Sequence, residues 1–407
     1  MIIKPKKPFV ETAHGVLKSV LKDEAAGGKL IMLFAVLALI VVNSPLQDIY
    51  NTFWHLTFSV GFDGIAISLD LREWVNEGLM AIFFLVVGLE IKRELVNGEL
   101  KDPKKAVLPL AAAIGGMIVP ALIYLAFNSG PETIKGWGIP IATDIAFAVA
   151  VLAFLSKHVP FSLKLFLLTL AIVDDIGAIF IIALFYAEII NYWFLAISIL
   201  TILTLWLTRK WLSKKLVFVI VLIGISLWIT THLSGIHASI VGAALGLLAP
   251  VPKSPDTPSF SKRLENFFLP ISTFIVLPVF AFANAGVTLS GGTIGNPDFR
   301  PVMIGIVAGL VIGKLVGISG ATWLMVKLGF ATLPTGTNWG HIVGVSLIAG
   351  IGFTVSIFIT GLAFADNEQL IEAAKISVFI ASGLAAGLGS FVIWIASKKA
   401  KMTIRNE

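Results

Sequence analysis

Runs of apolar residues, each near the length that crosses a lipid bilayer, recur along the chain from Leu30 to Ser397. A membrane-spanning helix needs roughly 20 mostly apolar residues. Twelve such helices are expected, over residues 30–43, 74–90, 106–127, 138–155, 163–187, 191–208, 216–231, 235–250, 268–288, 302–319, 339–360 and 372–397. The sequence therefore predicts an all-α polytopic membrane protein.

The composition supports this class. Of the 407 residues, 57% are apolar and 13% are charged, whereas a soluble domain is about 25% charged. The absence of cysteine excludes disulfides, thiolate catalysis and cysteine-based metal sites. Because no apolar core precedes Leu30, residues 1–29 do not resemble a signal peptide. We expect a cytoplasmic segment over 1–29, a transmembrane domain over 30–397 and a cytoplasmic tail over 398–407.

The basic residues predict the orientation. If the N-terminus is inside, three of the 30 Lys and Arg residues fall in outside loops (Arg72, Lys135 and Arg300), two fall within spans (Lys314 and Lys375), and the other 25 fall in inside segments. The positive-inside rule then places both termini in the cytoplasm. Since the positive charges sit in short loops between apolar runs, they do not indicate a nucleic-acid partner.

Two acidic residues stand side by side in the middle of an expected span. A charge at the bilayer centre costs about 2.5–3.5 kcal/mol or more, so such residues are functional candidates. Neighbouring helical residues point about 100° apart, so Asp174 and Asp175 cannot both face one point. One can line a water-filled cavity, with Ala171 and Ala178 leaving room beside Asp175, while the other contacts a second helix. A buried ion pair that only fixes helix packing is the alternative.

Two further spans carry signs of interruption. Pro140 lies in Gly136-Trp-Gly-Ile-Pro-Ile-Ala-Thr-Asp144 and removes a backbone donor. Asp144 follows it, and ion coordination and compensation of a helix dipole are equally open roles for this carboxylate. A second interruption is expected at Gly350 and Gly352. Two broken spans in corresponding halves of a chain are typical of a transporter site between them.

Lys314 is the remaining charge deep in an expected span, within Gly309-Leu-Val-Ile-Gly-Lys-Leu-Val-Gly317. Its natural partner is one of the carboxylates or the negative C-terminal ends of broken helices. A supporting role and a role in transport are both open.

These residues lie in motifs that strongly resemble the NhaA family of sodium/proton antiporters, and the resemblance covers about residues 27–397. The matching segments are Gly88-Leu-Glu-Ile-Lys-Arg-Glu-Leu95, Ala142-Thr-Asp-Ile-Ala-Phe147, Val173-Asp-Asp-Ile-Gly177, Ser234-Gly-Ile-His-Ala238, Phe280-Ala-Phe-Ala-Asn-Ala-Gly286, Gly313-Lys314 and Gly350-Ile-Gly-Phe-Thr354.

The resemblance implies an architecture and a set of roles. Spans 3–5 and 10–12 would form inverted three-helix repeats, and spans four and eleven would be broken and cross near the membrane centre. Asp175 would be the main ion ligand and Asp174 would pair with Lys314. Thr143 and Asp144 would sit at the crossing. The transported species would be Na⁺ or Li⁺ and H⁺ in the inner membrane, with no cofactor, with lipid around the chain and with a second copy as a candidate partner.

The family also has a cytoplasmic cluster tied to pH control, and the residues that match it are Glu90, Glu94, His237 and Glu265. The sequence departs from the family at Asn266 and Leu269, where the best-known members have histidines. Histidine titrates near neutral pH, so the pH profile is in doubt. His237 has the alternative role of helix packing. Glu90 and Glu94 could equally form a solvated face beside Lys92 and Arg93.

The function expected from these features is sodium/proton antiport, in which both ions compete for the same carboxylates. No ATP-binding motif is present in the sequence. One alternative is a sodium-coupled symporter of an organic solute on the same scaffold. Another is an intramembrane aspartyl protease, whose expected Gly-x-Gly-Asp element the sequence lacks.

Overall fold

A computed structural model describes residues 26–62, 65–187, 190–208, 217–252, 260–289 and 295–406. Residues 1–25 of the expected cytoplasmic segment lie outside this range, as do residue 216 of the seventh expected span and the last residue of the expected tail. Five basic residues that entered the orientation argument after the sixth and eighth spans also lie outside it: Arg209, Lys210, Lys214, Lys215 and Lys253.

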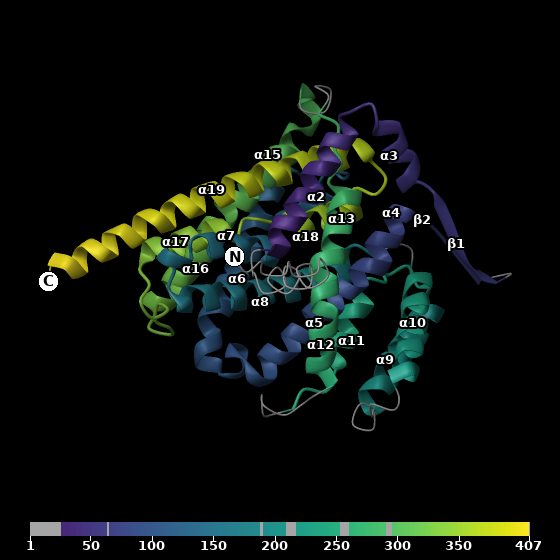
Figure 1. Cartoon of the computed structure of the whole chain (residues 1–407), viewed down its shortest axis with the longest axis horizontal. Helices are drawn as coiled ribbons and strands as arrows, with labels where there is room; N and C mark the ends of the chain where they lie inside the picture. The colour runs from purple at the N-terminus through teal and green to yellow at the C-terminus, as the bar shows by residue number, and fades with distance from the viewer. Residues whose placement is uncertain are drawn as a thin grey trace, which may run out of the picture.

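The first half of the chain is almost entirely helical. Its helices are α2 (Ala26–Val42), α3 (Gln47–Trp54), α4 (Leu71–Glu73), the π-helix η1 (Trp74–Leu79), α5 (Met80–Asn97), η2 (Glu99–Lys101), α6 (Pro103–Phe127), the 3-10 helix η3 (Ile134–Ile141), α7 (Ile145–Phe154), η4 (Ser156–His158) and α8 (Phe161–Phe185). Strands β1 (Thr57–Phe62) and β2 (Ile65–Asp70) form an antiparallel hairpin in which Thr57 faces Asp70. Figure 1 shows this hairpin projecting from the edge of the helices.

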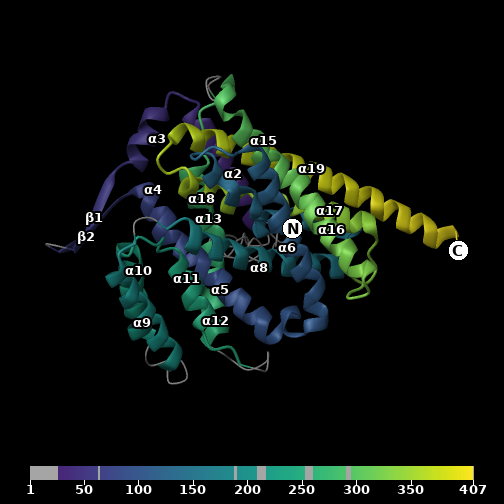
Figure 2. The same cartoon turned by 180° about the vertical axis from the view of Figure 1, so that it is seen from behind.

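The second half contains helices only, within its described residues. They are α9 (Tyr192–Thr208), α10 (Val217–Leu233), α11 (Ile240–Leu248), α12 (Phe260–Ile271), the π-helix η6 (Ser272–Val276), α13 (Leu277–Asn284), η7 (Pro297–Phe299), α15 (Arg300–Ala308), the π-helix η8 (Gly309–Gly313), α16 (Lys314–Lys327), α17 (Trp339–Ile348), α18 (Phe353–Ala363) and α19 (Glu368–Asn406). The long α19 carries the C-terminus away from the other helices (Figures 1 and 2).

Several helices are long and apolar enough to cross a membrane. The described residues contain six of them, or up to eight if the bent pairs α2–α3 and α17–α18 each count as one span. Two shorter apolar helices fall within α9 and α10. The expected multi-pass membrane protein is therefore confirmed as mostly helical, with a small β-hairpin added. Twelve crossings remain a prediction.

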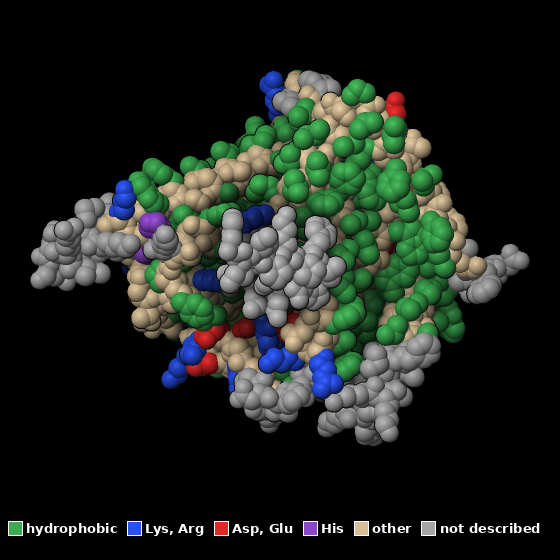
Figure 3. Space-filling model, viewed as in Figure 1, with side chains coloured by type: hydrophobic (Ala, Val, Ile, Leu, Met, Phe, Trp, Pro, Cys, Tyr) green, Lys and Arg blue, Asp and Glu red, His purple; other side chains and the backbone are tan. Residues whose placement is uncertain are grey.

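The outer surface of the helices is apolar, as a lipid-facing surface must be. On α9, Tyr192, Leu200 and Leu207 are each at least 60% exposed. Hydrophobic side chains cover much of the face seen in Figure 3. Helices α9 and α10 lie at the periphery in both ribbon views (Figures 1 and 2). Such exposure of large apolar side chains fits a multi-pass membrane protein.

Glycines bring pairs of helices into close contact. Helix α6 packs on α16, where a side chain at Gly115 would collide with the carbonyl of Gly317. Helix α5 packs on α11, where a side chain at Gly242 would collide with the carbonyl of Ala81. In a membrane the association of helices depends on such small residues, because apolar surface gains little by leaving lipid.

Candidate functional site

Two interrupted helices meet at the centre of the protein. The first runs from η3 to α7 and breaks at Ala142–Asp144, and the second runs from α17 to α18, with a bend of 45°. The amide of Asp144 donates to the carbonyl of Ile351 over 2.6 Å. The hydroxyl of Thr143 donates to the carbonyl of Ala349 over 2.8 Å. The breaks expected from Pro140 and from Gly350 and Gly352 thus face each other and bond directly.

Asp144 caps the N-terminal ends of two helices at once. One carboxylate oxygen accepts from the amide of Phe147 in α7 over 3.0 Å. The other accepts from the amide and the hydroxyl of Thr354 in α18, over 2.9 and 2.6 Å. Its side chain therefore compensates two positive helix ends. Thr354 belongs to the last matching motif, but sequence reasoning did not place it in the site, because only the fold brings it to Asp144.

Asp174 and Lys314 form an ion pair, and both side chains are fully buried. Lys314 also donates to the hydroxyl of Thr143 over 3.0 Å, and that hydroxyl bonds Oδ2 of Asp174 at 2.7 Å. The second oxygen of Asp174, Oδ1, has no hydrogen-bond partner among the described residues. The pair links α8 with α16 and attaches both to the crossing through Thr143.

Asp175 points the other way, as the helical angle between neighbours requires. It is 4% exposed and lines a cavity of about 430 Å³. No hydrogen bond to its carboxylate is found in the described part of the chain, in contrast to Asp144. A buried carboxylate without a fixed partner is available to a proton or to a hard cation.

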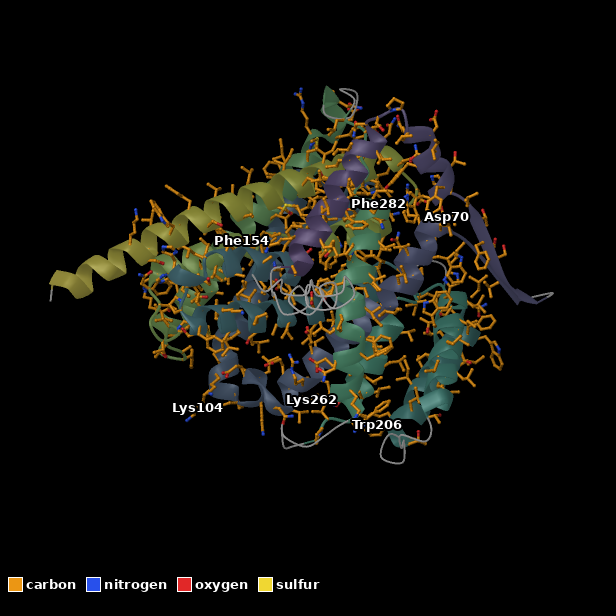
Figure 4. The ribbon with its side chains drawn as sticks, viewed as in Figure 1. Asp70, Lys104, Phe154, Trp206, Lys262 and Phe282 are labelled. Carbon is orange, nitrogen blue, oxygen red and sulfur yellow. The ribbon has the colours of Figure 1, made fainter. Side chains whose placement is uncertain are left out.

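The cavity beside this carboxylate is lined by residues of several elements. Those at the crossing are Thr143, Asp144, Asp175 and Thr354. The other lining residues include Gly27, Glu90, Lys164 and Leu269. Figure 4 shows Lys104 and Lys262 near the lower edge of the molecule and Asp70 higher up, at its right-hand side. The first two belong to expected inside segments and Asp70 to an expected outside stretch.

Three of the four pH-response candidates lie at the end of α5 that carries its C-terminus. Glu265 in α12 forms an ion pair with Arg93. Glu90 lines the cavity. Glu94 accepts from the amide of Glu99 over 3.0 Å and so closes the turn after α5. Asn266 is exposed, and Leu269 lines the cavity.

His237, the fourth candidate, lies apart from these three residues. Its Nδ1 lies 2.7 Å from Oε1 of Glu77, and its Nε2 lies 2.9 Å from the carbonyl of Tyr186. Glu77 precedes Glu90 by 13 positions, which is about 20 Å along a helix. His237 therefore packs at the opposite end of α5. The motif match identifies His237 in the sequence but does not say at which end of the helices the residue lies.

Oxygen donors suited to a hard cation surround the crossing, from carboxylates, threonine hydroxyls and carbonyls freed by the helix breaks. Clusters of three or more His, Asp or Glu that could hold a metal ion are absent from the described residues. A multi-pass membrane protein with two discontinuous helices around a buried carboxylate belongs to the class of ion-coupled membrane transporters.

Comparison with known proteins gives the family within this class. The sequence profile of the family described as Na+/H+ antiporter 1 matches residues 18–393. The chain is 42% identical to Na(+)/H(+) antiporter NhaA 1 of Clostridium beijerinckii, over 97% of both chains. It is 45% identical to Na(+)/H(+) antiporter NhaA of Pseudomonas putida, over 93% of this chain and 97% of the relative. The NhaA of Photorhabdus laumondii is 44% identical over 95% and 99%. The chain belongs to the Na+/H+ antiporter 1 family.

Proposed function

We propose that this protein exchanges Na⁺ or Li⁺ for H⁺ across the cytoplasmic membrane and so supports sodium extrusion and pH homeostasis. The observation that carries the proposal is the carboxylate of Asp175, buried, without a hydrogen-bond partner in the described structure and open to a cavity. The relatives that match this chain almost end to end are named Na(+)/H(+) antiporters, which supports the same function.

The mechanism follows from competition for one set of oxygens. Sodium must replace its lost water with carboxylate, hydroxyl and carbonyl ligands, and protons compete for the same carboxylates. If only a loaded site reorients, an inward trip with one species is coupled to an outward trip with the other. The proton gradient then supplies the energy.

Each residue of the crossing has a distinct proposed role. Asp175 exchanges the proton for the cation, and Thr143 and Asp144 supply further oxygens. Asp174 and Lys314 neutralise each other and hold α8 against α16. Glu90, Glu94 and Glu265 remain candidates for a response to pH at the inner end, whereas the contacts of His237 favour a packing role.

The proposed architecture has twelve spans, with inverted repeats in spans 3–5 and 10–12 and both termini in the cytoplasm. Helices occupy each of the twelve expected ranges where these are described, and Lys and Arg side chains gather along the lower edge of the face in Figure 3. The division into a cytoplasmic segment (1–29), a transporter domain (30–397) and a tail (398–407) belongs to the same proposal. A second copy of the chain is a candidate partner within the bilayer.

The alternatives receive no support. The relatives are named as antiporters, not as symporters or proteases. The sequence also lacks the Gly-x-Gly-Asp element expected of an intramembrane aspartyl protease. The protein is accordingly placed among transporters rather than enzymes.

Proton flux in proteoliposomes tests the function. The purified protein is reconstituted with a pH-sensitive dye, and Na⁺, Li⁺ or K⁺ is added to one side. We expect proton movement with Na⁺ and Li⁺, and little with K⁺. Flux that needs an organic solute together with sodium would replace exchange by symport.

A further inference from the structure

Helix η3 is the half of the first broken span that leads into the crossing. It runs in a 3-10 conformation and ends at Ile141, two residues before Thr143, and Gly136, Gly138 and residues 139–141 are buried. A 3-10 segment next to a break leaves backbone groups outside a regular α-helical ladder. At membrane depth such groups need partners from the protein.

Tyr186, at the C-terminal end of α8, supplies two of these partners with one hydroxyl. The hydroxyl donates to the carbonyl of Lys135 over 2.7 Å and accepts from the amide of Gly138 over 3.2 Å. Glycine is needed at 138, because a side chain there would collide with this hydroxyl. Tyr186 and Gly138 therefore form a docking pair between α8 and η3.

Tyr124 in α6 forms a second docking pair with the same segment. Its hydroxyl donates to the carbonyl of Thr133 over 2.6 Å. A side chain at Gly136 would collide with that hydroxyl. The same arrangement, a tyrosine hydroxyl resting on a glycine of η3, thus occurs twice, two residues apart.

A third hydroxyl comes from the other broken span. Ser356 in α18 donates to the carbonyl of Ile139 over 2.7 Å. Helix η3 is thereby held from α6, α8 and α18. Helix α8 also carries Asp174 and Asp175, so the bond from Tyr186 fixes the distance between the carboxylate pair and the broken span that presents Thr143 and Asp144.

We infer that the hydroxyls of Tyr186 and Tyr124 are positioning groups for the ion site: they fix η3 against α8 and α6 so that Thr143 and Asp144 stand at the right place for the cation held by Asp175. Neither tyrosine touches the cation. They act through the backbone of η3. The inference rests on the proposed exchange function and adds to it two residues that the sequence motifs do not single out.

The test is the apparent sodium affinity of Tyr186→Phe and Tyr124→Phe in the proteoliposome assay. Each change removes one hydroxyl and keeps the ring. A net hydrogen bond is worth about two- to tenfold in an equilibrium constant, so KM for Na⁺ is expected to rise by about that factor. The maximal rate at saturating Na⁺ is expected to stay within twofold of the unmodified protein.

Tyr50→Phe is the matched control. The hydroxyl of Tyr50 is bonded to the carbonyls of Phe282 and Ala283, away from the crossing. It should lower thermal stability in detergent about as much as the other two changes, with no change in KM. If all three variants show the same KM as the unmodified protein, or if Tyr50→Phe raises KM equally, the positioning role is wrong.

A double change tests the docking itself. Gly138→Ala alone should raise KM, because the new methyl group pushes against the hydroxyl of Tyr186. Combined with Tyr186→Phe, it should raise KM by less than the product of the two single effects. Multiplicative effects would contradict a direct contact. Absence of sodium-driven proton flux in the unmodified protein would overturn the proposed function instead, so the two failures are distinguishable.

Discussion

Two carboxylates are buried, Glu77 near one end of α5 and Asp175 at the crossing, and they differ in their hydrogen bonding. Their exposed fractions are similar, 8% and 4%. Both oxygens of Glu77 have partners, with Oε1 lying 2.7 Å from Nδ1 of His237 and Oε2 accepting from the amide of Ser239 over 3.2 Å. Asp175 has no such partner among the described residues. Burial is therefore common to the two carboxylates, and the difference between them is that only Glu77 has hydrogen-bond partners within the described structure.

The surroundings of the two groups sharpen the difference. Through His237, Glu77 also reaches the carbonyl of Tyr186 at the end of α8. It therefore ties η1 to the segments before α11 and after α8. Both carboxylates line cavities: Glu77 one of about 200 Å³, and Asp175 one of about 430 Å³ that it shares with Thr143 and Asp144. The first carboxylate connects separate segments of the chain, and the second is the one proposed to exchange its bound species.

The largest expected effect is that of Asp175→Asn. The amide keeps the shape of the side chain but can neither release a proton nor offer a full negative charge to a cation. We expect sodium-driven proton flux to fall by at least about a hundredfold, as for loss of a group that acts directly in a site, while thermal stability in detergent is kept. Flux close to that of the unmodified protein would contradict the assignment of Asp175.

The next largest effect is a loss of thermal stability on substitution of Lys314. Removing one partner of a buried ion pair leaves the other charge uncompensated, at a cost of about 3–5 kcal/mol. Lys314→Ala should therefore lower the melting temperature in detergent strongly, and the double change with Asp174→Asn should recover part of the loss. Lys314→Arg, which keeps the charge, serves as the control. An unchanged melting temperature in Lys314→Ala would mean that the pair does not support the fold.

Much of this arrangement follows from the sequence. The length and spacing of the apolar runs predict the helices, and a carboxylate pair on neighbouring helical positions predicts that one member turns away from the other. Asp174 and Asp175 are found in that relation, with Lys314 beside the first. These features depend on local periodicity and on the high cost of isolated charge in a membrane.

Other features depend on how distant segments meet, and sequence reasoning missed them. Nothing local shows that Thr354 donates to Asp144, or that Tyr186 bonds the backbone of η3. The contact of His237 with Glu77, away from Glu90 and Glu94, could not be predicted for the same reason. The π-helical turn η1 has no such sequence signal. The hairpin does have one that was overlooked, since apolar residues alternate at 58, 60 and 62 and at 65, 67 and 69 around an Asp-Gly pair.

A smaller effect is expected at Glu77, where a substitution should lower the stability of the protein but leave ion exchange unchanged. Glu77→Gln weakens the contacts to His237 and Ser239, and an imperfectly satisfied buried group costs about 1–3 kcal/mol. The melting temperature should fall, while KM for Na⁺ should stay within twofold of the unmodified protein. A large loss of flux in a variant that still folds would give Glu77 a part in exchange and break the contrast with Asp175.

The smallest expected effect is in the shape of the pH profile. Protons and sodium compete at Asp175, so acidification should raise KM for Na⁺, by about tenfold per pH unit once the carboxylate is protonated. Saturating Na⁺ should then restore most of the activity lost at low pH.

A separate switch would need groups that titrate near neutral pH at the inner end, where Asn266 and Leu269 cannot titrate. The variant Asn266→His combined with Leu269→His should displace or steepen the profile measured at saturating Na⁺, whereas the unmodified protein should give a shallow one. If the unmodified protein is instead inactivated steeply and high Na⁺ does not reverse this, a switch exists without those histidines. The ion pair of Arg93 and Glu265 would then be the first candidate for that switch.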